Sequence, residues 1–375
     1  MEEDDLTKLS SKIQELGDIE LAALLCLITE EHCIIQAESA ELENVERELR
    51  LICTRTFGLN CAVLECDEQT TLDDFGSGIL ADDWKGEGDG SVFAKAEVLR
   101  KGDDSFFSST TRGGAVMPAQ DENQRGKIAN VVVAKNLNVT SNQVQIQALE
   151  LMRGKRIFTR TAVQITPTRF LFVALLPTDK GPRLVQHLND HLSISHTHTM
   201  EDGLSNLEGR IREKRISSDI SSANSVIRSP PATPMFGKGS SMFTDALFSK
   251  DDIDSLLQSS SKVRMSPDVR GYLHDIVVFL RMHRAVAGGI SALATRHFHA
   301  LARALAPLHG IDYIPPSLVA LAARKIYPHR IIITTPENER STQWGSNVEA
   351  VAALLDGITV EDIIEEVLVN VEPPL

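Results

Sequence analysis

The sequence lacks the marks of a membrane or secreted protein. Its 375 residues contain no run of about 18 uncharged apolar residues, the length that a transmembrane helix requires. Residues 1–5 are largely acidic and precede no apolar stretch of the kind that a secretory signal contains. We therefore expect a cytoplasmic or nuclear protein that does not engage a membrane.

Basic residues and cysteines are also scarce. The 38 lysines and arginines are outnumbered by 52 acidic residues, and the net charge of −14 argues against a nucleic-acid partner, which would need a basic surface. The five cysteines are odd in number and lie within the first 66 residues, which fits a reducing compartment better than a disulfide framework. We interpret them as small buried apolar side chains: Cys26, Cys33, Cys53, Cys61 and Cys66.

The first half of the chain alternates helical and extended patterns. Three segments have apolar side chains at helical spacing: residues 16–31, 41–54 and 143–152. Short apolar segments suit strands or a hairpin: residues 33–35, 62–64, 128–134, 156–165 and 169–176. This alternation predicts an α/β fold whose mostly parallel sheet has helices on both faces. Length alone predicts two domains at about 150 residues each, and we place the first at residues 1–200.

Two segments interrupt this alternation. Residues 82–124 are rich in glycine, aspartate and serine, which predicts a flexible insertion. Residues 201–262 are rich in serine, and we expect a disordered linker because such segments bury too little apolar surface to offset their ordering entropy. Ser229 and Thr233 each precede a proline in this linker, so they are candidate sites for a proline-directed kinase; the alternative is an unmodified tether.

The last part of the chain, residues 263–375, is expected to be a helical domain. Apolar residues recur at helical spacing from Val269 and again from Ile290, and a third helix is expected at 315–326. The acidic segment 361–368 reads as a further amphipathic helix, which could belong to a partner surface. The apolar seam must pack against itself or against the first domain, with these core candidates: Leu273, Ile276, Leu280, Phe298, Leu301 and Leu305.

This helical part resembles the lid of AAA+ ATPases of the group that contains MoxR proteins and the magnesium chelatase I subunit. The resemblance rests on residues 265–269, 303–306 and 309–315 and on His329-Arg330, while residues 145–156 resemble the helix that follows Walker B. It implies an AAA+-like parallel-sheet core flanked by helices and followed by a helical lid. It also implies protein partners, with self-assembly as one form.

The phosphate-binding loop of that family has no counterpart after the first expected strand. The family places glycines there so that backbone N–H groups can approach the phosphates, and a lysine that supplies positive charge. In this sequence residues 36–44 contain neither glycine nor lysine, and Glu38, Glu41 and Glu43 stand there instead. Each like-charge pair a few ångströms apart would repel by about 1 to 4 kcal/mol, depending on exposure.

The other catalytic positions of the family also differ here. Lys135 and Asn136 stand where Walker B carboxylates would hold magnesium and orient the attacking water. A lysine cannot ligate magnesium, and an asparagine cannot accept a proton. By the same alignment, the first sensor, the arginine finger and the second sensor are replaced by Leu176, Asp190 and Leu293, with Arg296 one turn on as a partial substitute.

Three further clusters of polar residues have a functional and a plain interpretation. One is either a metal site or a solvated loop leaving the sheet, and we favour the loop: His187, His191, His196 and His198. A second is either an anion site or, as we favour, a solvated hairpin: Arg153, Lys155, Arg156 and Arg160. The third is expected to be a pair of surface or groove histidines: His297 and His299. We therefore expect no metal site.

Taken from sequence, the leading hypothesis is a non-catalytic AAA+-like module that acts as a scaffold or regulatory protein without a cofactor. The alternative is an ATPase subunit of the magnesium chelatase type, which would use ATP and magnesium to drive magnesium insertion into protoporphyrin. An enzyme of another class, built on the histidine cluster, is a third hypothesis. Measured binding and turnover of ATP separate the first two.

Overall fold

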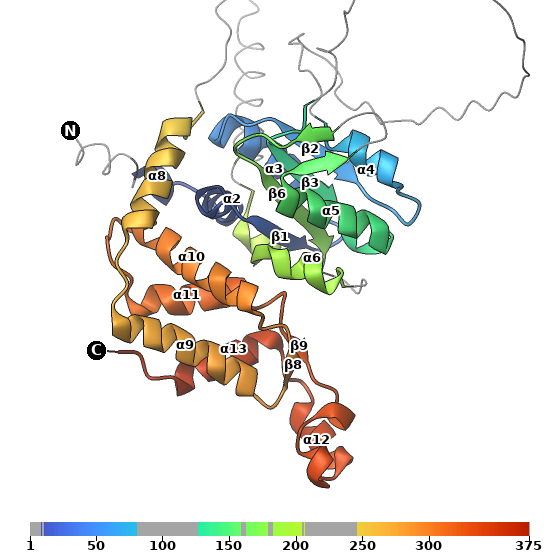
Figure 1. The fold of residues 1–375 in the computed structure, drawn as a ribbon, viewed down its shortest axis with the longest axis vertical. Coiled ribbons are helices and arrows are strands. Elements are labelled where there is room, and N and C mark those ends of the chain that lie inside the picture. The colour runs from blue at the N-terminus through green and yellow to red at the C-terminus, as the bar shows by residue number, and fades with distance from the viewer. Residues whose placement is uncertain are drawn as a thin grey trace, which may run out of the picture.

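A computed structural model describes residues 9, 11–80, 127–158, 163–178, 183–204, 206 and 246–374. Its centre is a five-stranded parallel sheet with the strand order β2-β3-β6-β1-β7 (Figure 1). The strands are β1 (His32–Ala37), β2 (Cys61–Glu65), β3 (Val131–Lys135), β6 (Leu171–Pro177) and β7 (Leu192–Thr197).

Each face of the sheet is covered by its own set of helices and its own apolar core. Successive strand residues point to opposite faces, so Val131 and Val133 of β3 enter one core while Val132 and Ala134 enter the other. The first core includes α2 (Asp18–Thr29) and α3 (Leu42–Leu51). The second includes α4 (Leu72–Gly78), α5 (Asn142–Gly154) and α6 (Gln186–His191). This double coverage explains why the central strands β3 and β6 are almost continuously apolar.

The C-terminal part of the chain is mainly helical, as expected. Its helices are α9 (Pro267–Met282), α10 (Ala292–Leu308), α11 (Pro316–Ile326), α12 (Val348–Leu355) and α13 (Val360–Asn370). Two features were not predicted: α12, and the small antiparallel pair formed by β8 (Val286–Gly288) and β9 (Ile332–Ile333). These two short strands join the segment before α10 to the segment after α11.

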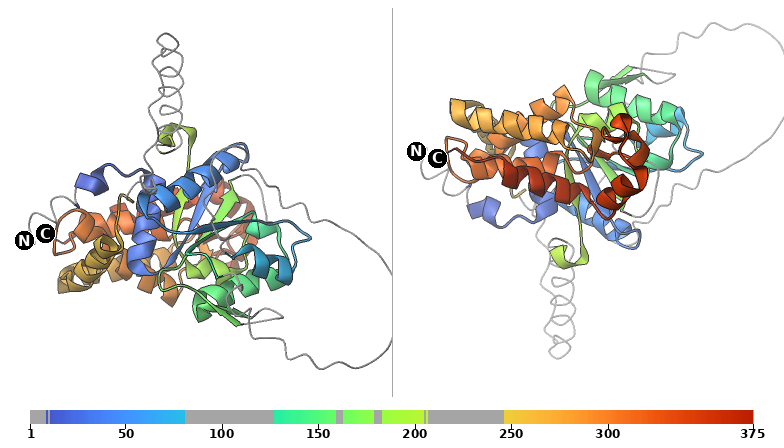
Figure 2. Two further views of the ribbon diagram at one scale, coloured as in Figure 1. Left: turned by 90° about the horizontal axis from the view of Figure 1, so that it is seen from above. Right: turned by 90° about the horizontal axis from the view of Figure 1, so that it is seen from below.

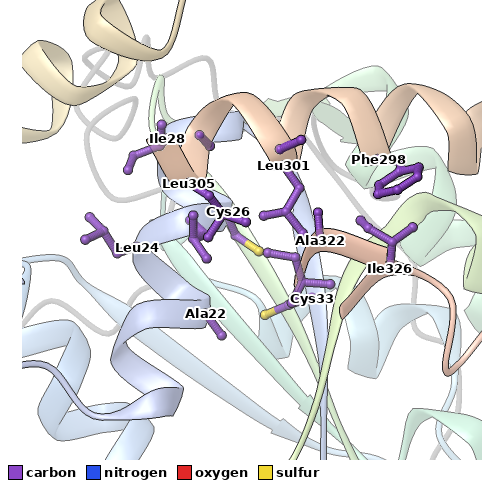
Figure 3. Close-up of a cluster of buried hydrophobic side chains, with 14 of the residues drawn as sticks. Ala22, Leu24, Cys26, Ile28, Cys33, Phe298, Leu301, Leu305, Ala322 and Ile326 are labelled. Carbon is purple, nitrogen blue, oxygen red and sulfur yellow. The ribbon is translucent and has the colours of Figure 1, made fainter. Parts of the chain in front are cut away.

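The lid and the α/β core share one apolar core. Figure 3 shows Cys26 and Ile28 of α2 facing Leu301 and Leu305 of α10, with Ile326 of α11 close by. From the sequence, the apolar seam of the lid could pack against itself or against the first domain. In the structure it does both. All six core candidates that we chose from the sequence are buried.

Two segments that we expected to be irregular are regular in the structure. The stretch around residues 192–198 is not a solvated loop, because β7 adds an edge strand to the sheet beside β1. Within the expected linker, α8 (Lys250–Lys262) is a helix capped by Ser249, with Ile253 and Leu256 buried. It packs against α2 and α10, so the helical part of the chain begins before residue 263.

The acidic C-terminal segment is also not a free surface. It forms α13, which lies alongside α9 (Figure 2) and buries Ile363, Ile364 and Val367. Nη2 of Arg324 on α11 donates to Oε2 of Glu365 at 2.8 Å. The lid itself thus covers the apolar face of this helix, and the expectation that the segment could belong to a partner surface stays a prediction for its exposed face.

Other expectations lie outside the described residues. They concern the insertion at 82–124, most of the linker, Arg160, and the phosphorylation candidates Ser229 and Thr233. Among the helices that the structure does describe, none has both the length and the apolar composition that crossing a membrane would need.

A buried histidine at the start of β1 makes the stability of the fold depend on pH. The side chain of His32 is 6% exposed, and its Nδ1 accepts a hydrogen bond from the backbone N–H of Phe172 at 3.2 Å. Burial lowers the pKa of His32 to about 4, and the nearby Glu31 offsets only part of that effect. The folded protein therefore keeps this imidazole neutral at pH values where the unfolded chain already binds a proton.

We predict that acidification from pH 7 to pH 5 costs about 2 kcal/mol of unfolding free energy through His32 alone. The loss starts as the pH falls through 6.5, the unfolded value, and ends near 4. In His32→Asn, the amide oxygen can still accept from Phe172, but the pH-dependent loss of unfolding free energy that comes from His32 should vanish. Urea unfolding of both proteins at the two pH values measures it, with the exposed His309→Asn as control. An identical loss in all three proteins would contradict the assignment.

Candidate functional site: the cleft between core and lid

A large hollow lies between the α/β core and the lid. Its volume is about 790 Å³. The core contributes Gln36 of β1 and residues 176–178 at the carboxyl end of β6, together with α6; the lid contributes residues 286–291 and 328–330. The carboxyl ends of parallel strands are where open α/β sheets usually bind ligands. The position therefore marks this cleft as the candidate site.

Three arginines line the cleft and also hold its walls together. Nε of Arg281 donates to the carbonyl oxygen of Ile290 at 3.1 Å, and Nη2 of Arg340 donates to that of Arg281 at 2.9 Å. Nη1 of Arg183 donates to the carbonyl oxygen of Ile331 at 3.4 Å, which connects the core to the lid. These guanidinium groups make the cleft more attractive to an anion than to a cation.

A fourth arginine, Arg330, is buried at the back of the cleft, with 2% of its surface exposed. Its Nη1 lies 3.2 Å from Oδ1 of Asp190 on α6. Its Nη2 donates to the carbonyl oxygen of Leu192 and to Nδ1 of His297, both at 2.7 Å. Burial lowers the pKa of Arg330 to about 10, and Asp190 opposes this shift. The guanidinium therefore stays charged at neutral pH and ties together α6, β7 and α10.

Asp190 also holds the start of α10. The hydroxyl of Ser291, the N-cap residue of that helix, donates to Oδ1 of Asp190 at 2.6 Å. The same hydroxyl oxygen accepts from the backbone N–H of Ala294 at 2.9 Å. Next to Asp190, the side-chain amide of Asn189 donates to the carbonyl oxygen of His329 at 2.9 Å. One short helix of the core thus fixes two segments of the lid.

Two histidines and a glutamate extend this buried network. Nε2 of His329 donates to the carbonyl oxygen of Leu192 at 2.8 Å, and burial, with Arg330 nearby, lowers the pKa of His329 far below its usual value. Nε2 of His297 lies 3.2 Å from Oε2 of Glu31, at the end of α2. Burial raises the pKa of Glu31, but the interaction with His297 outweighs it, so the net shift is downward. Glu31 therefore stays ionised.

A glycine permits the close approach of the two lid segments. Gly289 has a φ of +100°, and a Cβ there would lie 1.9 Å from the carbonyl oxygen of Arg330. No other residue type fits without moving the backbone. The position of Ser291 relative to Arg330 therefore depends on this glycine.

Of the positions that correspond to the phosphate-binding loop, Gln36 lines this cleft, but Glu38, Glu41 and Glu43 do not. Only residues 38–41 connect β1 to α3, and Glu38 is exposed there. Oε2 of Glu41 accepts from the side-chain amide of Asn44 at 2.8 Å, and Glu43 lies 3.6 Å from Arg47 one turn along α3. These carboxylates are thus engaged locally.

Lys135 occupies the carboxyl end of β3 and is 7% exposed. Its Nζ lies 3.4 Å from Oε2 of Glu46 on α3 and 3.8 Å from Oε1 of Glu65 at the end of β2. The next residue, Asn136, has a left-handed backbone with φ of 59°. A positive charge of the protein itself therefore sits between two carboxylates at this end of the sheet.

Some of the sensor and arginine-finger positions that the sequence pointed to line the cleft, and others do not. Leu176 and Asp190 line the cleft. Leu293 and Arg296 do not, and Arg296 is exposed on α10. Sequence reasoning missed the roles of Glu31, Ser291 and Arg330, although His329-Arg330 lay within the stretch that carried the resemblance.

The residues of the polar clusters that the sequence suggested lie at separate places in the structure or differ from expectation in their burial. His187 lines the cleft, whereas His196 and His198 are buried at the end of β7. His297 is 1% exposed, so its expected place at the surface or in a groove is wrong. The described members of the basic run are exposed, as expected: Arg153, Lys155 and Arg156. All five cysteines are free, and four of them are buried.

Comparisons with known proteins identify this architecture. The AAA lid domain family matches residues 278–352. A solved structure from Cytophaga hutchinsonii, described provisionally as an ATPase, matches with a TM-score of 0.61 and 17% identity over 100% of this chain and 98% of its own. The chain therefore has an AAA+ ATPase-like fold, in which a parallel sheet flanked by helices is followed by an AAA lid.

Curated proteins match shorter stretches of the chain. Maintenance of telomere capping protein 2 of Lachancea thermotolerans is 31% identical over 116 residues, 30% of this chain and 41% of that protein. Its namesake in Kluyveromyces lactis is 26% identical over 125 residues, 32% and 43% of the two chains. The uncharacterized protein YeaC of Bacillus subtilis is 27% identical over 131 residues, 35% and 36%. The matches thus span less than half the length of each relative.

We predict that Arg330→Gln destabilises the protein by about 3 kcal/mol, because it removes a buried guanidinium that three elements pack around and leaves the half-buried Asp190 without its cation. Chemical denaturation measures this loss, with Arg296→Gln as a matched control on an exposed arginine. In a double-mutant cycle with Asp190→Asn, the two changes should be strongly non-additive. Additive losses would show that Asp190 and Arg330 do not stabilise the lid as a pair.

Proposed function

We propose that this chain is an AAA+-like module that does not hydrolyse nucleotide and acts as a scaffold or regulatory protein. The observation that carries this proposal is the ion pair of Lys135 with Glu46. In AAA+ ATPases the end of this strand supplies a carboxylate for magnesium. An ammonium group repels the metal there, and its partner Glu46 belongs to the helix that would follow the phosphate-binding loop.

The connection between β1 and α3 supports the same proposal. Residues 38–41 offer no glycine and no lysine to a phosphate, and Glu38 adds negative charge. Phosphoryl transfer depends on a cradle for the phosphates, a bound metal and a group that orients water. Each of these would have to come from residues outside the aligned positions.

The alternative, an ATPase subunit of the magnesium chelatase type, makes a different demand on the cleft. The arginines at its rim would have to bind the phosphates, and a carboxylate would have to bind magnesium. Asp190 is the carboxylate within the lining, but it already accepts from Ser291 and Arg330. Binding metal there would release the start of α10, so we favour the non-hydrolysing module.

A partner surface is offered by the hairpin of β4 (Arg156–Phe158) and β5 (Val163–Ile165). Ile157 packs into the core below, whereas Phe158, Val163 and Ile165 are 60%, 55% and 75% exposed. The register pairs Phe158 with Val163 and Arg156 with Ile165, so all four side chains lie on one outward face. This face is apolar and lies beside exposed basic residues.

We infer that the partner on this hairpin is a second copy of the chain. A net charge of −14 gives another copy an acidic surface that complements the exposed Arg153, Lys155 and Arg156. Two relatives are named for telomere capping, and in such a process the acidic charge of this chain would favour contacts with proteins over contacts with DNA.

We predict no ATP hydrolysis above a protein-free blank in the presence of magnesium, for the wild type and for Lys135→Ala alike. Losing the metal and the water-orienting group removes several kcal/mol of transition-state stabilisation, and each 1.4 kcal/mol or so is tenfold in rate. A coupled phosphate-release assay, with an active AAA+ ATPase as positive control, measures this. Calorimetry with ATP and ADP separates binding from turnover. A rate near about one per second would overturn the proposal in favour of the chelatase-type ATPase.

We predict that light scattering at tens of micromolar finds the full chain self-associated and Phe158→Glu shifted towards monomer, because a buried carboxylate in the contact is costly. The control is Leu354→Glu, a residue of α12 that is 56% exposed. Truncation at the lid is unsuitable, because removing α13 would uncover α9 and α11. A monomeric wild type would exclude self-assembly through the hairpin.

A further inference from the structure

Two buried histidines lie outside the cleft, where the edge strand β7 ends. His196 and His198 are two residues apart, so both side chains leave the strand on the same side. The backbone N–H of His198 donates to the carbonyl oxygen of Gln36 at 2.7 Å, which continues the pairing with β1. The two side chains are 5% and 4% exposed, and their ring centroids are 6.4 Å apart.

A carboxylate is brought to the same place by a short helical turn at residues 200–202. One ligand atom from each of His196, His198 and Asp202 lies within 4.8 Å of the other two. Nδ1 of His198 is 3.9 Å from Oδ2 of Asp202. The backbone N–H and the hydroxyl of Thr199 donate to Oδ2 of Asp202 at 2.8 and 3.0 Å, so the carboxylate is held in position.

Each imidazole has one ring nitrogen without a hydrogen-bond partner among the described residues. Nε2 of His196 and Nδ1 of His198 are buried and have no hydrogen-bond partner among the described residues. A buried polar atom without a partner costs about 1 to 3 kcal/mol, so such atoms indicate a missing water or ion. The unprotonated nitrogen of a neutral imidazole offers a lone pair to a metal.

The adjoining space is small and negatively charged. A hollow of about 10 Å³ is lined by His198, Asp202, Glu20 and Glu48, among others. That is room for roughly one water-sized particle. The two glutamates are 5% and 2% exposed. A single cation suits this space better than an anion or an organic ligand.

We propose that His196, His198 and Asp202 bind one divalent transition-metal ion of the zinc class. Two imidazoles and one carboxylate suit zinc, with water as the fourth ligand, whereas magnesium and calcium prefer oxygen ligands alone. Tetrahedral bonds of about 2.1 Å place ligand atoms about 3.4 Å apart, so the side chains need to close by at most about 1.4 Å. The ion would hold the turn at residues 200–202 against the end of β7.

Zinc titration of the full chain, stripped with chelator and dialysed, tests the proposal. Calorimetry should find one saturable equivalent of Zn²⁺, and Co²⁺ at the same site should give the visible absorption bands of a tetrahedral centre. His198→Gln and Asp202→Asn should each weaken binding at least about tenfold, since even outer-shell changes cost that much. His309→Gln, at an exposed position, should leave the affinity unchanged.

Two results would overturn the proposal. The absence of saturable binding in the stripped chain would mean that water alone solvates the two unpaired nitrogens. Equal affinities in His198→Gln, Asp202→Asn and His309→Gln would place the zinc at other histidines. If His198→Gln fails to fold, Asp202→Asn still decides, because the Asp202 side chain is 31% exposed and an asparagine oxygen can still accept from Thr199.

Discussion

The buried guanidinium of Arg330 fixes how the lid sits on the core. A charge with 2% exposure needs acceptors for its donors, and its two Nη atoms find acceptors on α6, β7 and α10. Apolar packing between α2 and α10 supplies attraction without direction. The guanidinium adds direction, because a shift of the lid by a bond length would leave the buried Arg330 without its carboxylate partner.

Charged side chains are neutralised within the protein at two places, the cleft and the carboxyl end of β3. In the cleft, Asp190 is neutralised by a lid arginine, and at the end of β3, Lys135 is neutralised by Glu46 and Glu65. Under the proposed function, each of these internal pairs would occupy a place where an AAA+ enzyme meets its metal or its nucleotide. The fold would then be retained with its charged positions satisfied internally, in an architectural role.

The strands and helices that the sequence predicted well are those whose pattern reflects local burial, such as β3, with all five residues buried, and α10. β7 was missed because its polar side chains are covered by distant lid residues; the hydroxyl of Ser195, for example, donates to the carbonyl oxygen of Lys325. The ion pair of Asp190 with Arg330 could not be predicted either, because the two residues are 140 positions apart in the sequence. No local periodicity encodes a pair at that separation, whereas the aligned Lys135 and Asn136 could be located from their strand alone.

The shared core of α2 and α10 has a consequence for synthesis. Helix α2 ends at Thr29, and its partner α10 begins at Ala292. At about 5 to 20 residues per second, roughly a quarter of a minute to a minute passes before the ribosome has made that partner. Throughout this interval the lid-facing surface of the nascent α/β core, with Cys26 and Ile28, stays uncovered. The nascent chain therefore exposes an apolar surface to which chaperones can bind until the lid has been synthesised.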